Sequence, residues 1–92
     1  MKQRVPLEHK KAAALKYDKQ DTAPVVTAKG EGFLARRIVE IAQAADVPIV
    51  EDAALVSALL SLELGQEIPV ELYEAVARIL SWIYRLEKGE QA

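Results

Sequence analysis

The sequence contains no cysteine and no asparagine, and histidine occurs once, at His9. Without cysteine the chain has no disulfide, no thiolate nucleophile and no cysteine-based metal site. His9 lies among polar residues near the N-terminus and has no second histidine as a partner, so we expect no metal centre and no histidine general base. The absence of cysteine also suits a reducing compartment.

Long apolar runs and a strong net charge are missing as well. The longest apolar stretches are far shorter than a membrane span, and residues 1–6 lack the apolar segment of a signal peptide. The formal net charge of -2 does not indicate affinity for nucleic acid. We therefore expect a soluble cytoplasmic protein that carries no cofactor.

The apolar content is sufficient for one small domain. The chain has 92 residues, of which 51% are hydrophobic, so a core forms but a two-domain enzyme with an enclosed cleft does not fit. Residues 1–10 are polar and are expected to form an arm, residues 11–88 the domain, and residues 89–92 a disordered tail. Since no serine, acid or histidine lies in a catalytic arrangement, we do not expect an enzyme.

Three short apolar runs indicate β-strands. Residues 12–17 and 24–28 flank a turn-rich segment that is short enough for an antiparallel pair. Residues 47–50 form a continuous apolar run, which is typical of a buried parallel strand. With a helix between them, the second and third strands would form a right-handed crossover unit.

Helical spacing of apolar residues covers 33–45, 53 to about 64, and 68 to about 86. Gly65 is predicted to end the second helix, and Pro69 to open the last. The predicted fold class is therefore α/β: a small mixed β-sheet of about three to four strands, with one crossover helix and two C-terminal helices packed around it.

One stretch has the sequence motif of a phosphate-binding loop. Residues 30–35, Gly-Glu-Gly-Phe-Leu-Ala, fit G-x-G-x-x-A between a strand and a helix, and Glu51 follows about 20 residues on, where a dinucleotide-binding unit has its ribose-binding acid. However, Glu31 puts a carboxylate beside the phosphates, and too little chain remains for a second half of the sheet. We favour a tight strand-to-helix turn that uses the backbone freedom of Gly30 and Gly32, and keep nucleotide binding as a remote alternative.

The last helix has an apolar arc that is wider than the usual single stripe. One line is formed by Leu72, Val76, Ile79, Ile83 and Leu86. A second, flanking line is formed by Tyr73, Ala77, Leu80 and Tyr84. We favour a helix that lies in a groove between the sheet and the preceding helix, so that both lines are covered. The alternative is a flanking line that is partly exposed and meets a partner.

Taken together, several segments resemble a known family. The runs AAALKYD, APVVTAKGEG, ARRIVEIA, VPIVED and LELGQEIPVELYEAVARILSWIYRLE are similar to the C-terminal cytoplasmic domain of FlhB and its YscU and SpaS relatives, the switch proteins of type III secretion. The resemblance covers about residues 10–87. Its specific parts are the K-G-x-G turn at residues 29–32 and the G-Q-x-I-P segment at residues 65–69.

The chain departs from the family at the position of self-cleavage. Family members carry an Asn-Pro-Thr-His motif just before the strand that aligns with residues 12–17, and its asparagine cyclises and splits the chain. Here that motif position holds Leu7, Glu8, His9 and Lys10. Since asparagine is absent from the whole chain, this chemistry is not available, and the chain looks like an independently made counterpart of the fragment that cleavage releases.

The resemblance implies a function in protein export. We expect a non-catalytic component that binds export substrates, chaperone complexes or apparatus proteins, in the cytoplasm or peripherally at the membrane through the export apparatus. A further expected partner is the membrane-anchored part of FlhB; nucleic acid and direct membrane insertion are not expected. The alternative is a structural or decoy module that occupies the FlhB site without receiving substrate. In the family's arrangement the last helix passes the start of the second strand, which predicts an exposed apolar partner-binding patch of Ala23, Pro24, Ala77 and Leu80.

Overall fold

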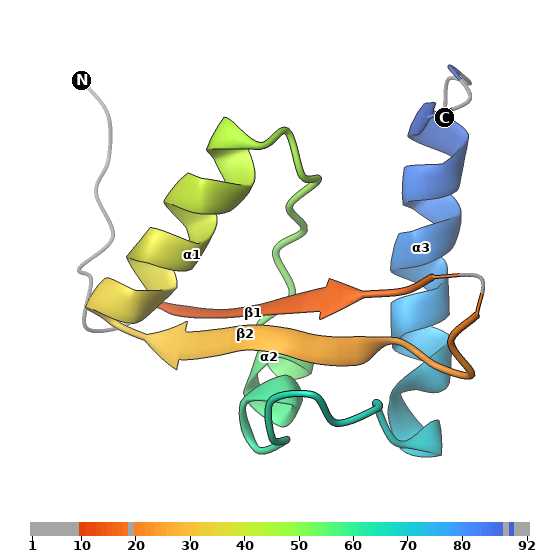
Figure 1. Ribbon diagram of the computed structural model, residues 1–92, viewed down its shortest axis with the longest axis horizontal. Coiled ribbons are helices and arrows are strands. Elements are labelled where there is room, and N and C mark those ends of the chain that lie inside the picture. The colour runs from red at the N-terminus through yellow and green to blue at the C-terminus, as the bar shows by residue number, and fades with distance from the viewer. Residues whose placement is uncertain (1–9, 19, 88, 90–92) are drawn as a thin grey trace.

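The computed structural model describes residues 10–18, 20–87 and 89. The two strands cross the middle of the molecule, α1 and α3 stand near their two ends, and α2 lies below them in the view of Figure 1. The elements are, in chain order, β1 (Lys11–Lys16), β2 (Val25–Glu31), α1 (Phe33–Ala44), α2 (Ala53–Leu60), the 3-10 helix η2 (Val70–Leu72) and α3 (Tyr73–Glu87).

The strands form the predicted antiparallel pair. The register runs from Lys11 opposite Glu31 to Lys16 opposite Val25, with a shift after Ala14 that leaves Thr27 without a partner on β1. Such a bulge bends the strand that carries the extra residue. The hairpin is therefore as expected, although β2 continues beyond the predicted end of its strand.

The other edge of β2 is covered by a segment that the sequence did not indicate. Residues 65–68 run beside the start of β2: the N–H of Val26 donates to the Gln66 carbonyl at 3.0 Å, and the N–H of Ile68 donates to the Pro24 carbonyl at 2.9 Å. An isolated antiparallel bridge joins Val25 to Glu67. This segment takes the place beside β2 that a third strand would take.

The predicted strand at residues 47–50 is wrong. In the described residues the sheet has two strands, and residues 47–50 are exposed and have no strand structure. An apolar run becomes a strand only beside a partner strand, and neither β1 nor β2 reaches it. The α/β class holds, but the mixed sheet of three to four strands and the crossover unit do not.

The helices lie close to where the spacing of apolar residues put them. Asp52 is the N-cap of α2, where its side chain accepts the N–H of Leu55 at 3.0 Å, as is favourable at a helix start. This helix ends at Leu60, earlier than predicted. Gly65, at φ 83°, does not end the helix but lies in the following turn, where its N–H donates to the Val26 carbonyl at 2.7 Å.

The core lies between the hairpin, α2 and the first half of α3. Its buried members come from the start of β2 and the segment before it, from α2 and the segment after it, and from α3. Val26 and Val76 are its largest fully buried side chains. The cluster consists of Ala23, Val26, Leu55, Leu59, Leu62, Ile68 and Val76. Because α2 and α3 pack on one side of the hairpin, its loop end is fixed against α3.

Candidate functional site

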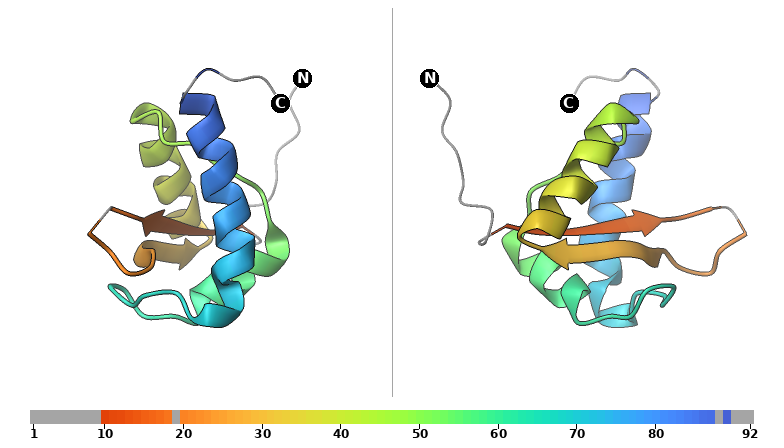
Figure 2. Two further views of the ribbon diagram at one scale, coloured as in Figure 1. Left: turned by 90° about the vertical axis from the view of Figure 1, so that its right-hand side faces the viewer. Right: turned by 60° about the vertical axis from the view of Figure 1, so that its left-hand side comes forward.

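An apolar hollow of about 330 Å³ lies between the loop end of the hairpin and α3. In Figure 1, α3 stands behind this end of the hairpin, and the left view of Figure 2 shows the same helix facing the viewer. The residues that line the hollow come from the end of β1, the start of β2, the segment at Ile68 and α3. They are Tyr17, Thr22, Ala23, Pro24, Ile68, Tyr73, Val76, Ala77 and Leu80.

The four residues of the predicted patch all line this hollow, but they differ in exposure. Ala77 is exposed and Leu80 half-buried. Ala23 is 2% exposed and Pro24 is also buried, so the prediction of an exposed patch is wrong for these two. The reason is that the N–H of Ile68 bonds the Pro24 carbonyl, which draws residues 65–68 over the start of β2 and makes Ala23 and Pro24 the floor.

The hollow offers contacts to an apolar ligand and none to an ion. None of its lining residues carries a charge. Tyr17 and Tyr73 are 50% and 43% exposed, and each combines an apolar ring with a hydroxyl group, as is common at protein interfaces. Tyr17 and Ile68 were missed by the sequence reasoning, and Tyr73 was placed in the flanking line of the last helix but not in the predicted patch. The available signal was an aromatic residue at the end of a strand and another at the start of a helix.

The exposed residues of α3 favour the alternative that the sequence left open, in which the flanking line of this helix is partly exposed. In the flanking line, Tyr73 and Tyr84 are 43% and 60% exposed, and Ala77 is exposed as well. The expected core line is also only partly covered, since Val76 is buried but Leu86 is 47% exposed. The helix therefore packs by its first half and does not lie in a groove along its length.

The glycine-rich turn has structural roles. The ammonium of Lys29 donates to the carbonyls of Leu60 (3.1 Å) and Leu62 at the end of α2. A Cβ on Gly30 would overlap the side chain of Leu34. Gly32 is the residue before α1 and has φ 62°. The ammonium of Lys29 is thus hydrogen-bonded to backbone carbonyl groups. Gly30 leaves room for the side chain of Leu34, and Gly32 adopts a positive φ that favours glycine.

The substituted cleavage motif lies mostly outside the described residues, since Leu7, Glu8 and His9 precede them. Lys10 is described, and its carbonyl accepts the N–H of Gly32 at 3.0 Å. The sheet contacts thus begin at Lys10, the last residue of the predicted arm of residues 1–10. The predicted arm of residues 1–10 and the predicted tail of residues 89–92 stay predictions, since most of both lies outside the described residues.

The described residues contain neither a metal-binding cluster nor a helix that could cross a membrane. No group of three or more histidine, cysteine, aspartate or glutamate residues in the described ranges has the arrangement to hold a metal ion. In the same part of the chain, no helix has the length and apolar character needed to cross a membrane.

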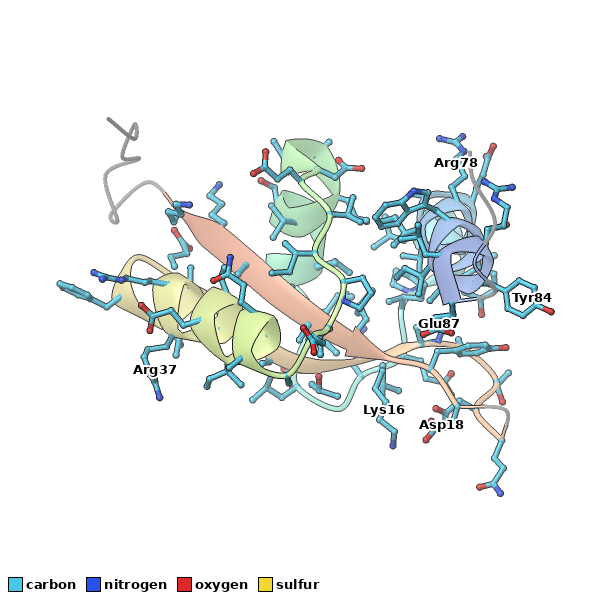
Figure 3. The ribbon with its side chains drawn as sticks, turned by 90° about the horizontal axis from the view of Figure 1, so that it is seen from above. Lys16, Asp18, Arg37, Arg78, Tyr84 and Glu87 are labelled. Carbon is cyan, nitrogen blue, oxygen red and sulfur yellow. The ribbon has the colours of Figure 1, made fainter. Side chains whose placement is uncertain are left out.

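Among the described acids, Glu40 on the outer side of α1 has a shifted pKa. Arg36 donates to a carboxylate oxygen of Glu40 at 2.9 Å and Arg37 to the other at 3.4 Å. The hydrogen bond from Arg36 is the largest cause that lowers the pKa of Glu40 below its usual value; desolvation opposes it, and the hydrogen bond from Arg37 adds to the lowering. Arg37 points away from the rest of the fold in Figure 3, so this group is a solvated ion-pair network.

Comparison with known proteins gives a consistent result. The family described as "FlhB HrpN YscU SpaS Family" matches residues 9–83. The chain is 46% identical over 90 residues to the uncharacterized protein YlqH of Bacillus subtilis (strain 168), covering 97% of this chain and 95% of that one. It is 44% identical over 83 residues to the flagellar biosynthetic protein FlhB of Escherichia coli (strain K12), covering 88% of this chain but 22% of the relative.

The fold is shared with a solved structure. The crystal structure of the PscU C-terminal domain aligns with a TM-score of 0.75 and 32% sequence identity, over 82% of this chain and 96% of that one. The chain thus spans nearly the whole of YlqH and of this domain, and about a fifth of the length of FlhB.

Proposed function

The chain belongs to the FlhB HrpN YscU SpaS family, and we propose that it is a non-catalytic component of flagellar or related type III protein export. In this proposal it acts in the cytoplasm at the export apparatus, where it binds export substrates, their chaperone complexes or apparatus proteins. It does so in the manner of the cytoplasmic fragment that cleavage of FlhB releases. It uses no cofactor and binds no nucleic acid.

The observation that carries this proposal is the uncharged hollow beside α3. Its floor is built from small residues, Ala23 and Pro24, and its wall from Ala77 and Leu80. Small side chains leave room for the side chains of a partner, and burial of a short apolar segment in an apolar hollow is favourable. At about 25 cal/mol per Å², burial of a few side chains gives modest affinity once the ordering costs are subtracted. Weak, reversible binding suits a site that binds successive substrates.

The test introduces a charge into the wall of the hollow. Ala77→Asp is the suitable variant, because Ala77 is exposed and the folded domain tolerates a charge there. Leu80→Asp is less suitable, since Leu80 packs against the core cluster. Isothermal titration with a purified export substrate should show at least a tenfold loss of affinity for Ala77→Asp, about 1.4 kcal/mol.

The matched control is Ser81→Asp. Ser81 is exposed on the same helix and does not line the hollow, so it adds the same charge to α3 without blocking the site. Both variants should keep the thermal midpoint of the parent protein. Equal substrate affinity of Ala77→Asp and the parent, with both folded, would contradict the proposal.

The second candidate is a module that occupies the FlhB site without receiving substrate. It is supported by the likeness to YlqH, because this chain covers 95% of that relative but 22% of FlhB of Escherichia coli. Rescue of export in a strain whose FlhB lacks its C-terminal fragment separates the two functions. A substrate-binding component restores export and Ala77→Asp does not, whereas a decoy binds the membrane-anchored part of FlhB and restores nothing.

A further inference from the structure

The acidic residues of the chain are concentrated in one stretch. Between Arg37 and Arg78 the sequence has eight aspartate or glutamate residues and no lysine, arginine or histidine. This stretch supplies Ile68, Tyr73 and Ala77 to the hollow beside α3. Although the net charge of the whole chain is only -2, the hollow therefore lies in a part of the molecule where acidic residues outnumber basic ones.

Two carboxylates are next in the chain to residues that line the hollow. Asp21 precedes Thr22 and Glu67 precedes Ile68, and both Thr22 and Ile68 line the hollow. Consecutive Cα atoms are about 3.8 Å apart, which is well within the distance of about 8 Å over which exposed charges act at physiological salt. Among the described residues, neither Asp21 nor Glu67 forms an ion pair, so both act on a ligand in the hollow.

A third carboxylate lies at the end of α3. Glu87 is exposed, and in Figure 3 it lies on the side of α3 that faces the hairpin. It comes about two turns after Leu80, which lines the hollow, and this is about 10 Å along the helix. Glu87 is the last residue of α3, where the helix dipole disfavours a carboxylate and favours a cation. The carboxylate and the helix end would both stabilise a cation bound there.

Two cations next to lining residues in the chain are each paired with an acid. Lys16 pairs with Asp18 at 3.2 Å, and Arg78 pairs with Glu74 at 2.8 Å. In Figure 3, Lys16 points away from α3, and Arg78 lies on the side of α3 that is opposite to the hairpin. In the described residues, the hollow is thus apolar inside and has an excess of negative charge around it.

We propose that the hollow recognises a polypeptide segment in which an apolar residue is flanked by lysine or arginine, and that Asp21, Glu67 and Glu87 attract these cations. This inference rests on the proposed function, since it names the class of segment that the hollow takes from its partner. An extended segment advances about 3.3 Å per residue, so the 10 Å to Glu87 correspond to about three residues. The partner therefore carries a basic residue about three positions from the apolar side chain in the hollow. Complementary charge of this kind gives specificity and fast association more than affinity.

The test uses capped synthetic peptides of the form Ser-X-Ser-Val-Leu-Val-Ser-X-Ser, in which each X is three positions from the central leucine. The first peptide has lysine at both X positions, and two matched peptides have glutamine or glutamate there. NMR titration of the isotope-labelled protein at low salt should show saturable binding. The lysine peptide should bind at least about threefold more tightly than the glutamine peptide, and the glutamate peptide more weakly than either. At high salt the three affinities should converge, because the charges are then screened.

Protein variants locate the basic residues of the peptide. Glu87→Gln should reduce the preference for the lysine peptide over the glutamine peptide at least about twofold, and should leave the affinity for the glutamine peptide unchanged. The matched control is Glu31→Gln, which removes the same charge at the end of β2 that is far from the hollow and should bind all three peptides like the parent protein. Ala77→Asp should bind the glutamine peptide at least about tenfold more weakly. The glutamine peptide is used for this variant because the new carboxylate would itself attract lysine.

Equal affinity of the lysine and glutamine peptides for the parent protein at low salt would overturn the proposal, and the proposed function would still stand if Ala77→Asp weakened the glutamine peptide. Absence of saturable binding by all three peptides would count against both. A peptide that keeps both lysines but has serine in place of valine and leucine should not bind; if it binds like the lysine peptide, the attraction is to negative charge alone and not to the hollow. Self-association of the peptide-free protein that Ala77→Asp abolishes, seen by analytical ultracentrifugation, would make a second copy of the chain the occupant.

Discussion

Helices α1 and α2 were both predicted from the spacing of their apolar residues, and they have very different surroundings. Within its eight residues α2 buries Leu55 and Leu59 against the hairpin. In the twelve residues of α1, Ala35 is the buried one, and Ile41 on its apolar side is 57% exposed. The spacing of apolar residues tells which face of a helix is apolar. It does not tell whether another element covers that face.

The largest expected effect comes from the covered helix. Leu59 is 4% exposed within the core cluster, so Leu59→Ala leaves a cavity and should lower the free energy of unfolding by about 2–5 kcal/mol. The matched change on the uncovered helix, Ile41→Ala, should alter it by less than about 0.5 kcal/mol. Urea denaturation of the two variants measures both values. Similar losses would show that α1 has a partner element in solution.

Gly30→Ala tests the point at which α1 is fastened to the sheet. The added Cβ would overlap the Cβ and Cγ atoms of Leu34, and overpacking of this kind should cost about 1–3 kcal/mol. If the overlap is the cause, the double variant Gly30→Ala with Leu34→Ala should regain part of the loss, because alanine removes the Cγ and Cδ2 atoms of Leu34 but keeps its Cβ. Thermal unfolding of the two single variants and the double variant measures this coupling.

If Leu34→Ala relieves none of the stability that Gly30→Ala loses, the strain lies in the backbone of the turn instead. The same variants also address the remote nucleotide alternative. A nucleoside triphosphate that binds the parent protein and not Gly30→Ala in calorimetry would revive it, because Gly30 would then be needed for approach of a phosphate.

The end of α2 offers a third test. Lys29 donates from its ammonium to the carbonyls of Leu60 and Leu62, where a cation is also favoured by the helix dipole. Lys29→Met keeps the apolar stem and removes these bonds, so it should lower the free energy of unfolding by about 1–2 kcal/mol. Lys16→Met removes a charge on the neighbouring strand at an exposed pair and should change stability by less than about 0.5 kcal/mol. Equal losses of stability in Lys29→Met and Lys16→Met would mean that removal of a positive charge, not of the two hydrogen bonds, lowers the stability.

Local features of the fold were predictable, and features that depend on a neighbour were not. The hairpin and the three helices follow from turn residues, apolar spacing and caps such as Asp52. The strand at residues 47–50 was wrong because an apolar run does not reveal whether a partner strand lies beside it. The segment at residues 65–68 was missed because its pairing to β2 comes from the turn at Gly65 rather than from a strand pattern.

In the candidate site, too, some features could be predicted from the sequence and others depend on a neighbouring segment. Ala23, Pro24, Ala77 and Leu80 were grouped through the resemblance to the family, and they do line one hollow. Their exposure was not predictable, because the cover over Ala23 and Pro24 is the unpredicted segment at residues 65–68. Periodicity alone placed Leu80 outside the core, whereas the structure packs it partly against the cluster.

The smallest expected effect concerns the outer face of α1. The pKa of Glu40 is lowered, chiefly by the hydrogen bond from Arg36 and less by that from Arg37. A carboxylate with a lowered pKa in the folded state contributes stability above its unfolded-state pKa, about 4.3 for glutamate, and loses it as the pH falls through the folded-state value. The contribution should therefore fade as the pH falls from about 4.3 through the lowered folded-state value, and it is small because the group is exposed.

NMR titration of the Glu40 side chain checks the order of these causes. Arg36→Gln should raise the pKa of Glu40 more than Arg37→Gln does, since Arg36 makes the shorter bond, 2.9 Å against 3.4 Å. Neither change should affect the thermal midpoint at neutral pH by more than a small amount, because these ion pairs join residues of α1 to one another. Equal shifts in the two variants would show that general positive charge, not the specific bond, lowers the pKa. A large loss of stability would mean that the charged face of α1 is held by another element, and that the apolar face is not its main uncovered side.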